Sequence, residues 1–125
     1  MTEPFGNETV EDVSEAFDLL RNARRRGVLY TLERNERMSV GTLASRIAAW
    51  QSEESERAPD AGNVETSLVH SHLPKLDASD VVEYDRDEQA VELADAASDL
   101  DPLLECTRER EAGFAAVSGL QTSNV

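Results

Sequence analysis

The chain has 125 residues, a length that suits one domain with one hydrophobic core. Its 26 acidic and 12 basic residues give a formal net charge of -14, and the single cysteine, Cys106, excludes an intramolecular disulfide. Because no apolar stretch approaches the roughly 20 residues of a membrane-spanning helix, and the first residues lack the pattern of a signal peptide, we expect a soluble, cytoplasmic protein without membrane contact.

The acidity has an unusual composition, because Lys75 is the only lysine and arginine supplies every other basic residue. A surface rich in Asp and Glu and poor in Lys is typical of proteins that work in very high salt, where salt screens the repulsion between carboxylates. The alternative is an ordinary acidic protein or one with a disordered acidic tail. The acids are spread along periodic segments, which favours the high-salt interpretation.

The first half of the chain predicts three helices. Residues 1–10 are polar and are expected to be flexible, and "VSEAFDLLRN" then carries apolar residues at helical spacing, with Ser14 as the expected N-cap. "NARRRGVLYTLERN" repeats this pattern after the capping residue Asn22, although Gly27 weakens it. "RMSVGTLASRIAAW" predicts a third helix capped by Ser39, and Met38 before it is either a one-residue strand remnant or a hydrophobic staple.

The second half contains a loop, a helix, a hairpin and a last helix. Residues 51–62 break the periodicity and predict an exposed loop, and "VETSLVHSHLPKL" predicts a helix over 63–76 in which Pro74 should cause a kink. Apolar residues on both sides of "DRDEQ" predict a hairpin with strands 81–84 and 90–93. Asp101 should cap a C-terminal helix that has Pro102 at its first position and runs to Gly119.

This order of elements predicts a mainly α fold with a small β-hairpin. Three helices followed by a hairpin are typical of a winged helix-turn-helix, here residues 11–97 with the wing at 81–93. Residues 98–119 would add the C-terminal helix, and 120–125 a tail. The helix that carries "SLVHSHLPKL", directly before the wing, is the candidate recognition helix.

Several stretches also resemble a known family. "LLRNARRRGVLYTL", "MSVGTLASRIAAW", "SLVHSHLPKLDASDVVEYD" and "VELAD" look like those of small winged-helix proteins from haloarchaea that form a domain family of unknown function. "VHSHLPKL" followed by "VV" is more distantly similar to the arsenic-repressor-like transcriptional regulators. The resemblance covers about residues 14 to 97, and it implies a DNA-binding transcriptional regulator without enzyme activity.

The sequence departs from related proteins at two places. Related winged helices usually have Gly directly before the first wing strand, where the backbone needs a positive φ, whereas this chain has Asp80. Asp tolerates that conformation at some cost, so we expect the turn to be kept. The helix-turn-helix turn is usually three or four residues, but here the loop 51–62 separates the two helices.

The two histidines offer alternative roles. Residues two apart on a helix point about 200° apart, so His70 and His72 are poorly placed to bind one metal ion. His72 falls among leucines, and we expect a partly buried side chain with a hydrogen-bond partner. His70 falls on the polar side, where it could contact a phosphate or a base edge. We therefore expect no metal site and no cofactor.

The expected DNA surface combines three segments. It comprises Ser39, Thr42, Thr66, His70, Ser71, Lys75 and Arg86. Most of the cations lie elsewhere, above all in Arg24, Arg25 and Arg26. These arginines either pair with nearby carboxylates and brace the fold, which we favour, or form a patch for phosphate or a partner.

The sequence therefore favours a DNA-binding regulator of a halophilic archaeon. Its partners would be double-stranded DNA and a second copy of the chain, paired through the C-terminal helix, although that helix could instead pack on the first helix of its own domain. The alternative is a winged-helix protein-interaction module that does not bind DNA. The chain shows no catalytic motif and is not expected to be an enzyme. Target sequence, effector and the direction of regulation are not encoded in any motif.

Overall fold

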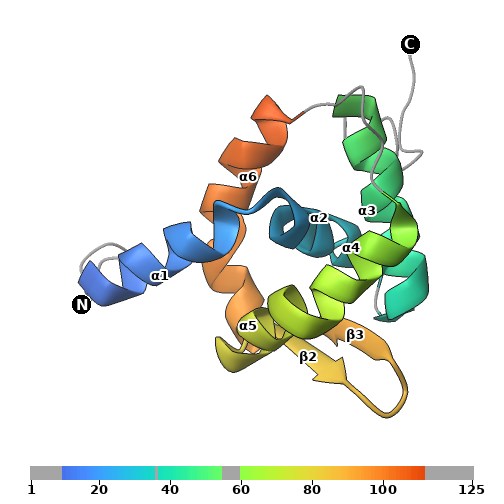
Figure 1. Ribbon diagram of the computed structural model, residues 1–125. Helices are drawn as coiled ribbons and strands as arrows, with labels where there is room; N and C mark the ends of the chain where they lie inside the picture. The colour runs from blue at the N-terminus through green and yellow to red at the C-terminus, as the bar shows by residue number, and fades with distance from the viewer. Residues whose placement is uncertain (1–9, 36, 55–59, 112–125) are drawn as a thin grey trace.

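The computed structural model describes residues 10–35, 37–54 and 60–111. Its elements are α1 (Val10–Leu20), α2 (Ala23–Leu32), β1 (Arg37–Ser39), α3 (Val40–Glu54), α4 (Ala61–Ser67), the π-helical turn η1 (Leu68–His72), α5 (Leu73–Ala78), β2 (Val82–Asp85), β3 (Ala90–Leu93), the 3-10 helix η2 (Asp95–Leu100) and α6 (Asp101–Arg110). Helix α2 lies at the centre, with α1 and α6 to one side and α3 and α4 to the other (Figure 1). The prediction of a mainly α fold with a small β-hairpin is confirmed.

The three strands form one antiparallel sheet in the order β1-β3-β2. Val91 at the centre of the sheet pairs with Met38 on one side and Tyr84 on the other. The hairpin is the predicted one, with its first strand one residue later than expected. Met38 lies in the three-residue strand β1, whereas the sequence predicted either a one-residue strand remnant or a hydrophobic staple at this position. This third strand ties the start of α3 to the wing.

Two predicted helix caps are confirmed. The side chain of Asn22 accepts hydrogen bonds from the backbone N–H groups of Arg24 and Arg25 in the first turn of α2. The hydroxyl of Ser39 accepts a hydrogen bond from the N–H of Thr42 at 3.1 Å, which satisfies an unpaired donor in the first turn of α3. Both caps are local features, and the sequence pattern alone identifies them.

The predictions of two other helix caps are wrong. Helix α1 begins at Val10, so Ser14 lies inside the helix and does not cap it. Helix α6 is capped by Leu100, and Asp101 is its first residue, one position later than a cap. Pro102 does lie in the first turn, as expected. The structure describes α6 only to Arg110, so the predicted extension to Gly119 and the tail lie outside the described residues, as does most of the N-terminal segment 1–10.

The candidate recognition helix is one continuous helical segment made of α4, η1 and α5. It begins at Ala61 and α3 continues to Glu54, so the predicted loop 51–62 is too long at both ends. A π-helical turn, in which the N–H of Leu73 bonds to the carbonyl of Leu68, precedes Pro74. Proline has no N–H to give to the preceding turn. The π-helical turn thus ends just before Pro74, the position at which a regular helix would lack one backbone hydrogen bond.

Among the described residues, the non-glycine residues with a positive φ are Asp80, at 62°, and Gln89, at 53°. The expectation that Asp80 takes the conformation usually given to Gly is therefore confirmed. Asp80 lies between α5 and β2, and Gln89 directly precedes β3. The two residues turn the chain into and out of the wing.

The core is centred on α2 and α3. Trp50 and Tyr30 are almost fully buried and meet edge to face, with ring centroids 5.9 Å apart. Gly27 lies against the Trp50 ring, because a Cβ atom there would come within 3.0 Å of that ring and 3.1 Å of Ile47. The glycine that weakens the helix in sequence terms is thus what allows α2 and α3 to pack closely. None of the helices in the described ranges is both long and apolar enough to span a membrane.

We expect Gly27→Val to lower the free energy of unfolding by about 2–3 kcal/mol, because the branched side chain would overlap Trp50 and Ile47. Chemical unfolding followed by Trp50 fluorescence measures this. The matched control is Gly41→Val in α3, where a Cβ atom meets nothing within 4 Å. Equal losses at the two positions would show that helix propensity, and not helix packing, explains the glycine.

Candidate nucleic-acid interface

Three parts of the fold carry the residues that the sequence predicts to contact DNA. Ser39 and Thr42 lie at the start of α3, Thr66 to Lys75 lie along the α4–η1–α5 helix, and Arg86 lies in the turn of the wing. The sheet joins these parts: Ser39 pairs with Ala90 of β3, and the N–H of Val40 bonds to the carbonyl of Gln89 at 2.9 Å. All seven candidate residues are exposed. We call this surface the candidate interface.

The candidate recognition helix, formed by α4, η1 and α5, has one buried and one exposed side. Val64, Leu68, Leu73 and Leu76 are all 0 % exposed and fix the helix in the core. Thr66, His70 and Ser71 are exposed. A polar helix face is thus held in a fixed position by an apolar face, which is the arrangement needed to present side chains to a groove.

His72 is half-buried and bonded, as predicted. Its Nδ1 lies 3.2 Å from Nη1 of Arg25, and because a guanidinium group only donates, Nδ1 must accept and the proton must sit on Nε2. Burial, and then the charges of Arg25 and Arg24, lower the pKa of His72 to about 4. His72 is therefore a neutral structural residue. Across the described residues, no group of three or more metal-binding side chains suits a metal ion.

Arg25 links three segments from a buried position. Its guanidinium donates to the carbonyl of Leu19 at 2.8 Å and to that of Asp18 at 2.7 Å, both in the last turn of α1, as well as to His72. Only 7 % of the residue is exposed. The end of α1 thereby receives the donors that its unpaired carbonyls need.

The neighbouring arginines also brace the fold. Arg24 donates to Gln51 at 3.1 Å and to the hydroxyl of Ser67 at 2.8 Å, so it joins α2 to α3 and α4. Arg26 binds both oxygens of Glu111, at 2.9 and 2.8 Å, beyond the end of α6. Arg24, Arg25 and Arg26 thus brace the fold as predicted, but within the described residues only Arg26 does so through a carboxylate, whereas Arg24 and Arg25 use neutral acceptors. The sequence did not show which segments they join.

Lys75 is less available for DNA than the sequence suggested. Its Nζ lies 2.8 Å from a carboxylate oxygen of Asp18, and its side chain is 43 % exposed. The hydrogen bond from Lys75 is the main cause that lowers the pKa of Asp18. The only lysine thus fastens the recognition helix to α1, and a phosphate would have to compete with Asp18 for it.

The wing tip mixes one cation with several acids. The guanidinium of Arg86 lies over the ring of Tyr84, 5.2 Å from its centroid, in a cation–π contact. Asp85 accepts hydrogen bonds from the N–H groups of Asp87 and Glu88, and these bonds, with Arg37 nearby, lower its pKa. The wing tip therefore stays strongly acidic around Arg86.

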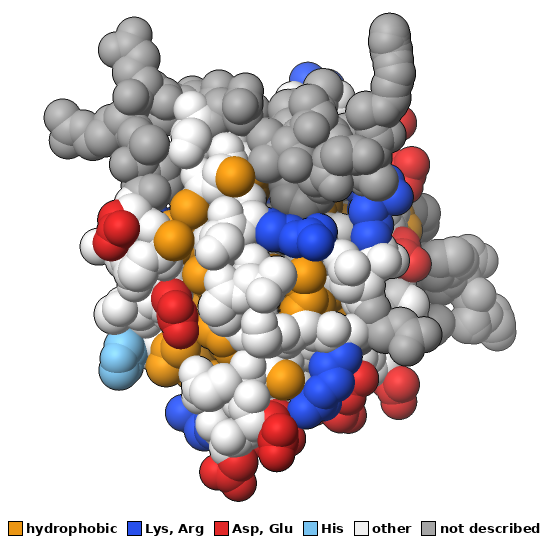
Figure 2. All heavy atoms as spheres, turned by 90° about the vertical axis from the view of Figure 1, so that its right-hand side faces the viewer, with side chains coloured by type: hydrophobic (Ala, Val, Ile, Leu, Met, Phe, Trp, Pro, Cys, Tyr) orange, Lys and Arg blue, Asp and Glu red, His pale blue; other side chains and the backbone are white. Residues whose placement is uncertain are grey.

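Figure 2 shows the face of the molecule that lies to the right in Figure 1, where α3 and the wing are found. Basic and acidic side chains are interspersed around a largely uncharged centre, and acidic side chains gather at the lower end. Neither sign of charge forms one continuous strip on this face. The charge pattern by itself therefore favours neither DNA nor a basic partner.

Residues 17–92 match a protein family described as a domain of unknown function, DUF7344. The chain belongs to this family. The match runs from the middle of α1 to β3, so the DUF7344 region contains the candidate interface and leaves out α6. No curated protein and no solved structure shows significant similarity to the chain.

We expect Arg25→Met to destabilise the DUF7344 region by about 3 kcal/mol or more, because it leaves two carbonyls of α1 and the ring of His72 without their donor. Urea unfolding measures the loss. Arg21→Met is the matched control, since the Arg21 side chain is 77 % exposed and its pair with Asp18 should contribute little. A similar, small effect at both positions would contradict the bracing role.

The low pKa of His72 predicts a pH-dependent stability. His72 binds a proton near pH 6.5 in the unfolded chain but only near pH 4 in the folded chain. As the pH falls, the imidazole is therefore protonated first in the unfolded state, which is stabilised relative to the folded state. Stability measured relative to His72→Gln should be constant above about pH 6.5 and should fall between there and pH 4. Unfolding curves of both proteins across this range test it. A difference that stays constant would show that His72 does not titrate on unfolding.

Proposed function

We propose that this protein is a DNA-binding transcriptional regulator of the winged helix-turn-helix type. The observation that carries the proposal is the recognition helix, whose buried leucines fix it in the core while Thr66, His70 and Ser71 face outward. The start of α3 and the wing flank this helix through the shared sheet. Such a surface can read base edges with the helix and hold the backbone with its neighbours.

The interaction is proposed to depend on direct contacts more than on charge. Lys75 is paired with Asp18, and Arg86 is surrounded by acids, so few cations can neutralise phosphates. Release of counterions supplies much of the DNA affinity of ordinary proteins, but this contribution falls steeply as salt rises. A high-salt cytoplasm, which the composition of the chain indicates, would remove that advantage from any protein. Hydrogen bonds from His70, Ser71 and Thr66 would then decide specificity.

Ser39 and Thr42 are proposed to set the position of the protein on the DNA backbone. Their hydroxyls lie 2.9 Å apart at the exposed start of α3. Ser39 already accepts from the N–H of Thr42, so the two hydroxyl groups are held in one orientation. Ser39 donates its hydroxyl proton to Thr42, so the Thr42 hydroxyl is the donor that can reach a phosphate. An uncharged donor at a helix start suits this role, because the helix N-terminus favours negative charge.

The proposal predicts that the tagged protein, recovered from cells with its bound DNA, enriches discrete sites that share a sequence motif. The variant His70→Ala/Ser71→Ala should lose these sites, because both side chains are exposed and their loss leaves the core unchanged. The matched control is Ser98→Ala/Asp99→Ala, which alters two exposed residues of η2 outside the candidate interface. Lys75 is left intact, since its replacement would also disturb α1.

The outcome decides between two functions. Sites lost only in the His70/Ser71 variant support a regulator that reads DNA through this helix. No enrichment above an untagged control would contradict DNA binding. It would instead favour a winged-helix module that binds another protein, an alternative that the acidic wing and the engaged Lys75 also fit.

A further inference from the structure

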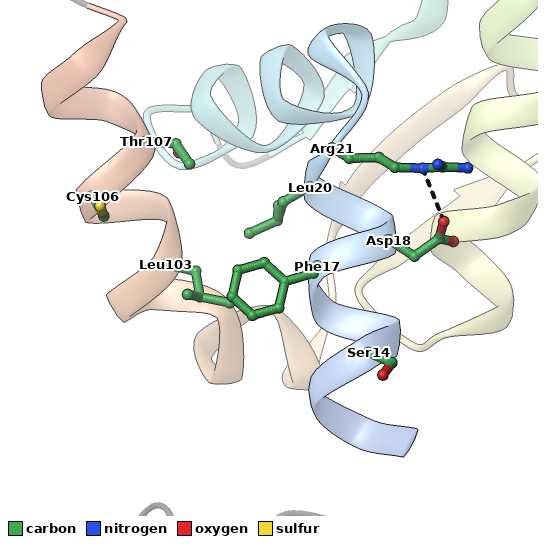
Figure 3. A pocket seen from close by; sticks show the side chains of 8 residues that line it. All are labelled: Ser14, Phe17, Asp18, Leu20, Arg21, Leu103, Cys106 and Thr107. Carbon is green, nitrogen blue, oxygen red and sulfur yellow. Dashed lines mark ion pairs between the residues drawn. The ribbon is translucent and has the colours of Figure 1, made fainter. Parts of the chain in front are cut away.

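Most basic side chains in the described part of the chain already have a partner within the fold. Arg21, for example, pairs with Asp18 at 3.1 Å beside the groove of about 460 Å³ that lies between α1 and α6 (Figure 3). The other engaged cations are Arg24, Arg25, Arg26, Arg37, Lys75 and Arg108. A phosphate would have to compete with these partners before it could bind any of these side chains.

Four described arginines form no ion pair and no side-chain hydrogen bond, and they are Arg34, Arg46, Arg86 and Arg110. Arg34 follows Glu33, which is bound to α6, and Arg110 is the last residue of α6. Both therefore lie outside the candidate interface. Arg86 lies over a tyrosine ring among the acids of the wing tip. Arg46 is thus the free cation on α3, the helix that also supplies Thr42.

Helix α3 presents Arg46 on the same exposed face as Thr42. Leu43, Ala44 and Ile47, at most 1 % exposed, hold the opposite face in the core. Thr42 and Arg46 are both exposed and are four residues apart, so they lie one helical turn apart on one side. Long side chains on a helix lean back toward its N-terminus. The guanidinium of Arg46 is therefore directed toward Thr42 and the start of α3.

These two side chains offer different donors to one ligand. The Thr42 hydroxyl accepts the proton of Ser39 at 2.9 Å and keeps its own proton to donate. A guanidinium donates two parallel hydrogen bonds and suits the oxygens of a phosphate. Arginine and threonine side chains are both common contacts to the DNA backbone.

The position of α3 places these donors beside the surface that would read the bases. Helix α3 packs against α4, which begins the candidate recognition helix, and the N–H of Val40 ties the start of α3 to Gln89 in the wing. In helix-turn-helix proteins the helix before the recognition helix crosses the DNA backbone. A phosphate held by α3 would therefore lie next to the groove that His70 and Ser71 face.

We propose that Arg46 and Thr42 together bind one phosphate of the DNA backbone. The inference rests on the proposed function, and it adds the cation that the candidate interface otherwise lacks. Because the phosphate is the same at every base pair, this contact fixes the position of the candidate recognition helix and carries no sequence information.

High salt makes the position of a single cation decisive. At about 1 M salt the screening length is only about 3 Å, so a charge acts on DNA only where it touches it. Arg34 and Arg110, which lie outside the candidate interface, would then contribute almost nothing to binding. The proposal therefore predicts different effects for arginines that are equally exposed and equally free of partners.

The test measures the affinity of the purified full-length chain for labelled DNA duplexes by fluorescence anisotropy over a series of potassium chloride concentrations. The duplexes are genomic fragments that the tagged protein enriches, beside fragments that it does not enrich. Arg46→Gln should weaken binding to both by about 10-fold. The slope of log affinity against log salt concentration should become less steep by about 0.9 for each protomer bound. Arg34→Gln, the matched control, removes the same charge and should change neither quantity.

A second variant separates loss of the contact from loss of the fold. Arg46→Lys keeps a cation, so it should retain the wild-type salt slope while losing part of the affinity, because lysine cannot form the paired hydrogen bonds. The thermal midpoint of Arg46→Gln should match that of the wild type, since the side chain is exposed and has no partner among the described residues.

The outcomes distinguish this inference from the proposed function. A wild-type salt slope in Arg46→Gln would overturn the phosphate contact, even where His70→Ala/Ser71→Ala loses its sites and DNA binding stands. Equal losses in Arg46→Gln and Arg34→Gln would also overturn it, because net charge would then explain the effect. A wild-type chain that binds no duplex at any salt concentration would contradict both proposals together.

Discussion

The hydrogen bonds of Arg25 hold together the parts of the fold on which the candidate interface depends. One buried guanidinium completes the C-terminal turn of α1 and fixes the neutral ring of His72 in the recognition helix. A buried charge is costly unless every donor has a partner, and here α1 supplies carbonyl oxygens and His72 supplies an acceptor nitrogen. The relative placement of α1, α2 and the candidate recognition helix therefore depends on a side chain whose hydrogen bonds go to neutral acceptors.

The scarce cations of this acidic chain are used mainly inside the molecule. Arg24 and Arg26 join helices, Lys75 fastens the recognition helix to α1, and Arg37 pairs with Asp85 and Glu92 across the sheet. Each of these contacts links segments far apart in sequence. High salt weakens such contacts little, because several of them are partly buried and are therefore screened less than surface ion pairs. The cost is a candidate interface with few positive charges.

Features that depend on neighbouring residues were predictable from the sequence, and features that depend on distant ones were not. Asn22, Ser39 and Asp80 follow from capping and backbone preferences within a few residues. The burial of His72 follows from helical periodicity. The prediction of Ser14 as a cap failed because α1 begins four residues earlier, at Val10. The exposure of Phe17 depends on the position of α6, which is distant in sequence. The predicted DNA contacts stay predictions, because exposure alone does not show what a side chain binds.

The π-helical turn constrains the length of the recognition segment. A turn of this kind holds one residue more than an α-helical turn, so it rotates everything after it by about 100° around the helix axis. This rotation brings Val64 and Leu76, on either side of the turn, onto the same buried face and lets Lys75 reach Asp18. A deletion of one residue within Leu68–His72 would restore a regular helix but would turn Lys75 away from α1. The fold can therefore tolerate other side chains at the exposed positions of His70 and Ser71, but not a change in the number of residues in this segment.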